Sequence, residues 1–231
     1  RECTLQRRHQ KVIEEAPSAG LPPALRERLL ADAVKLATGV NYRGLGTVEF
    51  VVTGNDYFFL EVNPRLQVEH PVTEEVTGLD LVELQLRIAD TGRLPLAQSD
   101  VRCEGHAFEA RLCAEDVEAG FLPTTGRLER VDFSRAAVRI ESGVESGDEI
   151  SPFYDSMIAK LVSRGPNRES ARRALAAGLR DSTVIGLTTN LQFLHELLQW
   201  PQTLDGSFHT RLIDETFAAS ATARPAPIPP C

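Results

Sequence analysis

The sequence predicts an α+β protein, and three patterns support this fold class. The runs TVEFVV (47–52) and YFFLEV (57–62) are rich in β-branched and aromatic residues, and the turn-forming residues 54–56 separate them, which predicts a β-hairpin. From Pro23 onward, apolar residues recur at spacings of three and four, which is typical of an amphipathic helix. Residues 104–165 hold short strand-like runs between Gly, Pro and Asp turns, and two helical segments follow.

Composition narrows the class of protein. The chain has 231 residues, of which 25% are charged and 42% are hydrophobic, and its net charge is −8, which argues against nucleic-acid binding. No apolar run approaches the roughly 20 residues of a membrane span. The four cysteines, Cys3, Cys103, Cys113 and Cys231, form no CxxC pair. We therefore expect free thiols in a reducing compartment, such as the cytoplasm or, in a eukaryote, the mitochondrial matrix.

The first forty residues predict a strand and a helix. Residues 1–15 suit a strand in which cations alternate with Gln and His side chains. This strand is either a solvated edge strand or one that faces an anion such as a phosphate. The helix begins at Pro23 and ends near Gly39, and its apolar face consists of Leu25, Leu29, Ala33, Leu36 and Val40.

The rest of the chain divides near residue 100. A helix over residues 79–90 is apolar on most of its surface, so we expect it to be buried. The strands of residues 104–165 predict an antiparallel sheet or a small barrel, and Asn167 and Asn190 are expected to cap the two helices that follow. Residues 218–230 are rich in Ala and Pro and predict an extended linker.

The hairpin carries an unusual charge pattern. Pairing its strands about Asn55 puts Glu49 directly opposite Glu61, and like charges in that position are destabilising. A divalent cation between them would relieve the repulsion, and Asn63 lies two residues past Glu61, on the same face. Oxygen ligands of this kind favour Mg²⁺ or Mn²⁺ over zinc. A salt-bridged hairpin is the alternative, but no basic residue of the hairpin alternates onto that face.

Five segments resemble the biotin carboxylase family, in the same order and at similar spacing. They are QRRHQKVIEEAP (6–17), EVNPRLQVEHPVTE (61–74), GHAFEARLCAED (105–116), FLPTTGRL (121–128) and SPFYDSMIAKL (151–161). The resemblance extends to about Phe217. It implies the second lobe of an ATP-grasp fold over residues 1–100, a biotin carboxylase carboxyl-terminal domain over 101–217 and a tail over 218–231. The reaction it implies is carboxylation of biotin by ATP and bicarbonate through carboxyphosphate, within a larger acyl-CoA, pyruvate or urea carboxylase.

The resemblance also implies a role for each matching residue. Glu69 resembles the general base that deprotonates bicarbonate, and Arg111 resembles the arginine that stabilises the biotin enolate. The other implied positions are Lys11, Arg65, Gln67 and the Val68 backbone around bicarbonate; Gln6, His9, Glu49 and Glu61 toward ATP; and Glu49, Glu61 and Asn63 around one or two Mg²⁺ or Mn²⁺ ions. Without the resemblance, Arg111 would be expected to form a surface ion pair with Glu109 or Glu115.

Parts of the family pattern do not occur in this sequence. The chain begins with Arg1, and we find neither the glycine-rich lid of the family nor a lysine flanked by methionines to which biotin could be attached. We therefore expect a piece of a longer polypeptide that is inactive alone, works with a biotin carrier domain and a carboxyltransferase, and can form a homodimer. Two other functions remain open: an ATP-grasp ligase of the carbamoyl-phosphate synthase type, and a non-catalytic assembly scaffold.

Overall fold

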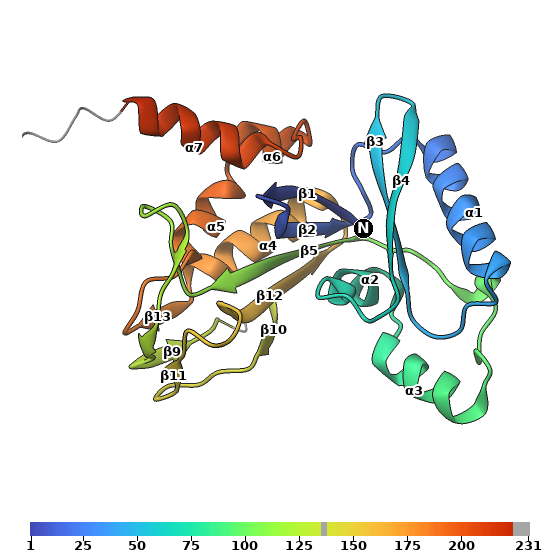
Figure 1. The fold of residues 1–231 in the computed structure, drawn as a ribbon, viewed down its shortest axis with the longest axis horizontal. Helices are drawn as coiled ribbons and strands as arrows, with labels where there is room; N and C mark the ends of the chain where they lie inside the picture. Colours follow the sequence, from blue (N-terminus) through green and yellow to red (C-terminus); the bar gives the residue numbers. More distant parts are fainter. Residues whose placement is uncertain (135–137, 224–231) are drawn as a thin grey trace, which may run out of the picture.

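A five-stranded antiparallel sheet forms the centre of the molecule (Figure 1). The computed structural model describes residues 1–134 and 138–223. The strands of the sheet follow the order β1 (Glu2–Arg7), β2 (Gln10–Ala16), β5 (His106–Cys113), β12 (Met157–Gly165) and β10 (Val138–Ser142). Because β2 pairs with β5 across the predicted boundary near residue 100, residues from both halves of the chain build one sheet. The domain boundary itself stays a prediction.

Helices cover both faces of this sheet. Phe108 packs in a large apolar cluster with α4 (Arg168–Arg180) and α5 (Leu191–Leu197), whereas its neighbour Ala107 packs in a small cluster with Val72 and Val76 of α2 (His70–Thr77). Successive strand residues point to opposite faces, so α2 and α4 lie on opposite sides of the sheet. The face under α2 is the one that carries Glu109 and Arg111, two and four residues beyond Ala107.

The β-hairpin forms a separate two-stranded sheet of β3 (Thr47–Thr53) and β4 (Asp56–Asn63). Glu49 lies directly opposite Glu61 as predicted, but the strands do not pair about Asn55: Thr53 pairs with Asp56 and Phe50 with Phe59, and a β-bulge between Phe50 and Glu49 then shifts the register by one residue. Helix α1 (Pro23–Gly39) lies beside the hairpin (Figure 1), where the Tyr57 hydroxyl donates to Asp32 at 2.6 Å. The hairpin and α1 lie to one side of the sheet (Figure 1).

The prediction of a single strand over residues 1–15 is wrong. The segment folds into the hairpin of β1 and β2, and Arg8 and His9 form its turn with φ values of 46° and 67°. Positive φ is uncommon outside glycine, and no Gly or Asn marks this turn in the sequence.

The prediction that the helix over residues 79–90 is buried is also wrong, and the apolar face of α1 is largely exposed as well. In α1 only Leu25 is buried, and α3 (Leu81–Thr91) has no buried residue; Val34 is 62% exposed and Leu86 is 66% exposed. Apolar periodicity identifies the face of a helix that favours burial, but not whether another element covers it. Among the described residues, no element buries any side chain of α3, and α1 is covered only at Leu25 and beside Tyr57 of the hairpin.

The predicted strands of residues 104–165 are confirmed as antiparallel, but they form an open sheet and small two-stranded pairs instead of a barrel. The pairs are β6 (Glu115–Asp116) with β7 (Leu122–Pro123), β8 (Gly126–Arg127) with β11 (Glu149–Ile150), and β9 (Arg130–Asp132) with β13 (Thr183–Ile185). A short 3₁₀ helix, Gln98–Asp100, precedes β5.

Of the two predicted helix caps one is confirmed, and the predicted extended tail is partly wrong. Asn167 caps α4, because its side chain accepts from the backbone N–H of Ser170 at 2.9 Å. Asn190 stands at the start of α5 but makes no capping bond, since its side chain pairs instead with the backbone of β5. Helices α6 (Pro201–Asp205) and α7 (Leu212–Ala223) follow, so the expected extended linker is wrong for 218–223, and 224–231 lie outside the described residues.

Two expectations from composition also have outcomes. Cys3, Cys103 and Cys113 are free thiols, and Cys231 lies outside the described residues. Over residues 1–134 and 138–223, none of the helices combines the length and the apolar composition that crossing a membrane requires.

Substitution of two glycines that have positive φ would distinguish the cost of backbone strain from the cost of a steric clash. Gly78 and Gly105 have φ values of +69° and +75°, but a Cβ at Gly78 would meet nothing within 4 Å, whereas a Cβ at Gly105 would lie 2.5 Å from the Gly165 carbonyl oxygen. We predict that Gly78→Ala lowers the free energy of unfolding by about 1 kcal/mol through strain alone. Gly105→Ala should cost about 1–3 kcal/mol more, because the β5–β12 backbone must move. Urea unfolding measures both, and equal costs would contradict the proposed clash.

Candidate active site

Lys11 lies where the sheet, the hairpin and the start of α2 meet. Its Nζ donates to Oε1 of Glu49 on β3 at 2.7 Å and to Oε1 of Glu69 at 2.8 Å. The side chain is half-buried, and burial alone would lower its pKa, but its anionic partners raise the pKa above the ordinary value. Lys11 therefore stays protonated and holds two carboxylates from different elements together.

Glu69 is the most enclosed of the predicted catalytic groups. Its side chain is 1% exposed, and it contacts Nζ of Lys11, Nη2 of Arg111 at 3.1 Å and Nη1 of Arg1 at 3.7 Å. Burial pushes the pKa of Glu69 upward, but the hydrogen bond and charge of Lys11 outweigh it, so the pKa lies below its usual value. Glu69 also precedes the first residue of α2, where the helix dipole favours negative charge.

Arg111 on β5 joins Glu69 to a second buried carboxylate. Its Nε donates to Oε1 of Glu14 at 2.6 Å, and its Nη2 contacts both Glu14 and Glu69. Burial lowers the pKa of Arg111, but the charge of Glu14 reverses this effect and raises it. The surface ion pair considered from the sequence, with Glu109 or Glu115, is not the arrangement found.

The three predicted metal ligands lie together on the hairpin. The Asn63 amide contacts Oε1 of Glu49 at 3.2 Å and Oε1 of Glu61 at 2.7 Å, with its nitrogen assigned to face them. If the amide turned over, three oxygens would converge on one point, which suits a hard divalent cation. The donor set therefore fits Mg²⁺ or Mn²⁺. No basic residue of the hairpin lies with these groups, as expected, and the cation that reaches Glu49 is Lys11 of β2.

The remaining predicted residues fall into two groups. Gln67 is buried and its Nε2 lies 3.4 Å from Oε1 of Glu49, and the Val68 carbonyl accepts from Nζ of Lys160 at 2.8 Å, so both adjoin the cluster around Lys11. Arg65, in contrast, is exposed and bonds to the carbonyl of Leu66. The structure does not bring its guanidinium to the cluster.

Gln6 and His9, two of the four residues predicted to lie toward ATP, belong to the β1–β2 hairpin. The Gln6 amide donates to the Cys3 carbonyl at 3.4 Å, and His9 is exposed in the β1–β2 turn. Gln6 lies directly opposite Lys11 in the register of β1 and β2, although among the described residues no side-chain hydrogen bond joins the two.

Sequence reasoning missed two members of the site, Glu14 and Lys160. Glu14 stands beside Glu15 in a strand, so one of the two must face the interior, and in the structure both are buried. Lys160 interrupts the apolar run MIAKLV, and a lysine at such a position needs a buried partner. Both signals are present in the sequence, but neither identifies the partner.

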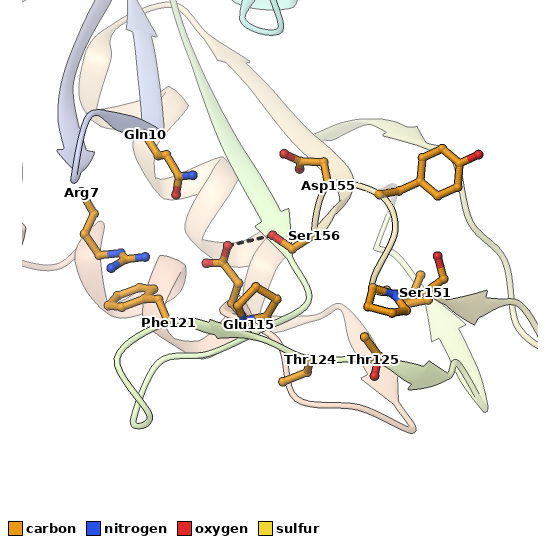
Figure 2. Close-up of a pocket in the computed structure, with 13 residues that line it drawn as sticks. Arg7, Gln10, Glu115, Phe121, Thr124, Thr125, Ser151, Asp155 and Ser156 are labelled. Atoms are coloured by element: carbon orange, nitrogen blue, oxygen red, sulfur yellow. Dashed lines mark hydrogen bonds between the residues drawn. The ribbon is translucent and has the colours of Figure 1, made fainter.

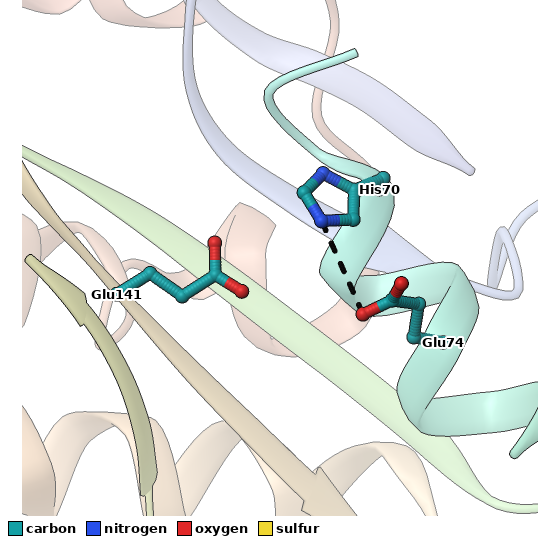
Figure 3. A group of neighbouring side chains, drawn as sticks. All are labelled: His70, Glu74 and Glu141. Atoms are coloured by element: carbon teal, nitrogen blue, oxygen red, sulfur yellow. Dashed lines mark ion pairs between the residues drawn. The ribbon is translucent and has the colours of Figure 1, made fainter. Parts of the chain in front are cut away.

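A second acidic group, His70, Glu74 and Glu141, lies beside the site (Figure 3). Its carboxylates are already paired with cations: Arg139 with Glu74 at 2.8 Å, and Lys160 with Glu141 at 2.6 Å. The His70 ring uses Nδ1 on the Gln67 carbonyl at 2.9 Å. The group therefore forms an ion-pair network that ties α2 to β10 and β12.

A cavity of about 510 Å³ opens just beyond the carboxyl-terminal end of β5 (Figure 2). It lies between the β1–β2 turn and the loop before β12, and its walls include Arg7, Glu115, Phe121 and Asp155. The Arg7 guanidinium lies 4.1 Å from the centre of the Phe121 ring. None of the site residues predicted from the sequence lines this cavity.

Comparison with protein families divides the chain into two matches. Residues 1–97 match the family described as "Carbamoyl-phosphate synthase L chain, ATP binding domain", and residues 109–215 match "Biotin carboxylase C-terminal domain". These matches confirm the predicted α+β class, with an ATP-grasp lobe followed by a biotin carboxylase carboxyl-terminal domain.

Curated relatives share nearly half of the residues. The alpha subunit of the mitochondrial methylcrotonoyl-CoA carboxylase of Rattus norvegicus is 48% identical over 93% of this chain, and the match spans 30% of the rat protein. Pyruvate carboxylase of Aspergillus niger is 45% identical over 94% of this chain and 19% of its own length. The chain thus spans less than half of each relative.

Solved structures agree with these matches. The biotin carboxylase domain of a thermophilic 2-oxoglutarate carboxylase bound to bicarbonate superposes with a TM-score of 0.89 and 40% identity, over 92% of this chain and 48% of that one. The urea carboxylase of Kluyveromyces lactis has a TM-score of 0.89 and 39% identity, over 92% of this chain and 19% of that one.

The depressed pKa of Glu69 predicts a pH-dependent contribution to stability. The ionised carboxylate stabilises the fold above its unfolded pKa of about 4.3, and this contribution is lost as pH falls through the lower folded pKa. Glu69→Gln should therefore lower the free energy of unfolding by about 1–3 kcal/mol at pH 7 and by less at pH 3. Urea unfolding at several pH values measures the difference, with the exposed Glu83→Gln as control. A cost that grows on acidification would contradict the assignment.

Proposed function

This chain belongs to the biotin carboxylase family, and we propose that it supplies one wall of a site where biotin is carboxylated with ATP and bicarbonate. The observation that carries the proposal is the 3.1 Å ion pair between Glu69 and Arg111. Glu69 lies in the part of the chain that matches the ATP-binding family, and Arg111 lies in the part that matches the biotin carboxylase family. A base and a cation from the two parts thus adjoin at one point.

The cations around Glu69 suit an anionic substrate. Lys11 and Arg111 lie on either side of the carboxylate, and both keep their positive charge. Bicarbonate or carboxyphosphate would bind these two cations, with Gln67 and the Val68 backbone beside them and with Arg65 turning in from solvent. A guanidinium offers the planar fork that such anions accept.

The same geometry explains how Glu69 can act as a base. With its pKa held low by Lys11, the free carboxylate is a weak base, whereas efficient general bases have a pKa near the working pH. An anion that shares Lys11 and Arg111 adds negative charge next to Glu69 and weakens its hold on both cations. The pKa of Glu69 then rises, so that it accepts the bicarbonate proton once the substrate is bound.

Arg111 has a second role in this proposal. Deprotonation of the biotin ureido nitrogen leaves negative charge on the biotin, and a fixed guanidinium nearby stabilises that charge. The two contacts with Glu14 hold the guanidinium in place before biotin arrives.

The hairpin completes this wall on the nucleotide side. Glu49, Glu61 and Asn63 would hold one or two Mg²⁺ or Mn²⁺ ions, which supply charge neutralisation to the ATP phosphates when bound. Because Lys11 contacts Glu49 as well as Glu69, it connects the carboxylates of the hairpin to the anion site. Gln6 and His9 remain the proposed contacts toward the nucleotide.

Biotin itself would arrive on a carrier domain, and a carboxyltransferase would take up the carboxyl group. The relatives are named for methylcrotonoyl-CoA, pyruvate, 2-oxoglutarate and urea carboxylases, so the reaction class is common to them and the acceptor is not. A homodimer is a further proposal, since one related biotin carboxylase domain is described as a dimer.

One observation favours the alternative of a carbamoyl-phosphate synthase type of ligase, namely the family description of residues 1–97. The contact of Arg111 with Glu69 weighs against it, because Arg111 belongs to the part that matches biotin carboxylases. Free biotin as the acceptor separates the two reactions.

A chimaeric enzyme tests the proposal. Residues 1–217 would replace the matching part of the biotin carboxylase domain of the 2-oxoglutarate carboxylase, which supplies the rest of that domain. We predict phosphate release that requires ATP, bicarbonate and free biotin together, and a loss of roughly 10²–10⁴-fold in kcat with Glu69→Gln, as expected for a general base. Glu83→Gln, an exposed carboxylate on α3, is the control. Activity that persists in Glu69→Gln would refute the assigned role.

The chain alone should bind metal without catalysing the reaction. No residue of the hairpin that carries the proposed metal ligands is buried, and none of those ligands lines the 510 Å³ cavity beyond β5. We predict no biotin-dependent phosphate release from residues 1–231. Mn²⁺ binding, followed by electron paramagnetic resonance, should weaken about tenfold, or about 1.4 kcal/mol, in Glu61→Gln, which removes a charged ligand, and stay unchanged in Glu83→Gln. Unchanged binding in Glu61→Gln would contradict the metal site.

A further inference from the structure

Two buried glutamates face each other behind Arg111. The register of β2 and β5 pairs Glu14 directly with Glu109, and both residues are 0% exposed. Side chains at such paired positions lie side by side, with Cβ atoms roughly 4.5–5.5 Å apart. Two ionised carboxylates at this separation in the interior would repel each other strongly.

Three of the four carboxylate oxygens of this pair lack a hydrogen-bond partner in the described structure. Oε1 of Glu14 accepts from Arg111, but Oε2 of Glu14 and both oxygens of Glu109 have none. An unpaired ionised carboxylate costs several kcal/mol to bury, and proteins avoid that cost by protonating the group. Glu109 has the stronger need for a proton, because no cation among the described residues donates to it.

The cations near Glu109 form their hydrogen bonds and ion pairs with other groups. Arg111, on the same strand, binds Glu14 and Glu69, while Lys160, on β12, binds the Val68 carbonyl and Glu141. Glu69, at the start of α2, adds negative charge, and α2 itself contributes the apolar side chains Val72 and Val76 to this face. Helices α4 and α5 pack on the opposite face of the sheet.

We propose that Glu14 and Glu109 share one proton, with Glu109 as the carboxylic acid that donates to Oε2 of Glu14. The pair then carries one negative charge, which Arg111 neutralises through Oε1 of Glu14. No bond other than this O–H···O hydrogen bond forms, and no further reactant is needed. Burial acts in the same direction on both groups, since it raises the pKa of Glu14 to about 7 and the pKa of Glu109 well above its usual value.

The shared proton gives the pair a positioning role. A single charge behind Arg111 holds the guanidinium in one orientation, yet leaves its Nη2 toward Glu69. If both Glu14 and Glu109 were ionised, their two negative charges would draw the Arg111 guanidinium toward them and away from Glu69. This consequence for the reaction rests on the proposed function, whereas the shared proton does not.

The proton also makes stability depend on pH in a defined direction. Over the range between the unfolded pKa of about 4.3 and the raised folded pKa, the folded chain holds a proton that the unfolded chain has released. Stability due to Glu109 is therefore fully present below the lower value and falls as pH rises. The unfolding constant of the wild type should increase by about tenfold per pH unit relative to a variant without this group.

Two measurements on residues 1–231 test the proposal, and neither depends on enzymatic activity. At pH 8, infrared spectroscopy should detect the carbonyl stretch of a protonated carboxylic acid, although exposed carboxyl groups are ionised there, and Glu109→Gln should abolish it. In urea unfolding between pH 5 and pH 8, Glu109→Gln should gain stability relative to the wild type as pH rises, whereas Glu83→Gln should not.

The outcomes are decisive in either direction. If Glu109→Gln fails to fold, the infrared band of the wild type, followed through its loss at alkaline pH, still tests the proton. Absence of the band at pH 8 in the wild type would overturn the proposal, and so would a Glu109→Gln stability difference that is constant with pH. Failure of the chimaeric enzyme to carboxylate biotin would overturn the proposed function and leave the shared proton standing.

Discussion

The site depends on the ion pairs of one carboxylate, Glu69, with Lys11 and Arg111. Lys11 comes from β2, Arg111 from β5, and Glu69 from the loop that begins α2, so three elements meet at one charge. Each cation also holds a second carboxylate: Glu49 on the hairpin for Lys11, and Glu14 for Arg111. Because opposite charges alternate along this chain of contacts, loss of Glu69 would leave Lys11 and Arg111 without the anion between them.

An excess of carboxylates explains the features on either side of these ion pairs. On the solvent side, Glu49 and Glu61 lie opposite each other, and a divalent cation would relieve their repulsion. On the buried side, Glu14 and Glu109 stand in the same relation, but no metal ligand set surrounds them among the described residues, and Arg111 occupies Oε1 of Glu14. The two pairs differ in solvent access. A hydrated cation can reach Glu49 and Glu61 on the hairpin, whereas the closed face under α2 leaves room only for a proton between Glu14 and Glu109.

The sequence predicts the parts of this site that depend on local pattern. Turn-forming residues between two β-rich runs predict the β3–β4 hairpin, and Asn167 caps its helix because the bond spans three residues. The register next to the turn would place Glu49 opposite Leu60, and a β-bulge beside Phe50 brings Glu61 there instead. Contacts between distant segments have no such local signature. Lys11 reaches Glu49 across 38 residues and Arg111 reaches Glu14 across 97, and nothing within β2 or β5 predicts these partners. Asn190 illustrates the same limit, since a bond to the β5 backbone replaces its expected cap.

The residues around Glu69 lie in a well-packed part of the chain, whereas the carboxylates of the hairpin lie in a part with few buried side chains. Glu69, Arg111 and Glu14 are supported by the five-stranded sheet and its large apolar cluster, whereas no residue of the β3–β4 hairpin is buried. Local opening costs least free energy where few apolar contacts are lost, so the hairpin should move more readily than the sheet. Lys11 and the bond from Arg1 to Thr47 connect the hairpin to β1 and β2. We therefore expect Glu69 and its two cations to form the rigid part of the site, and the carboxylates of the hairpin to be the part that would adjust to the proposed metal and nucleotide.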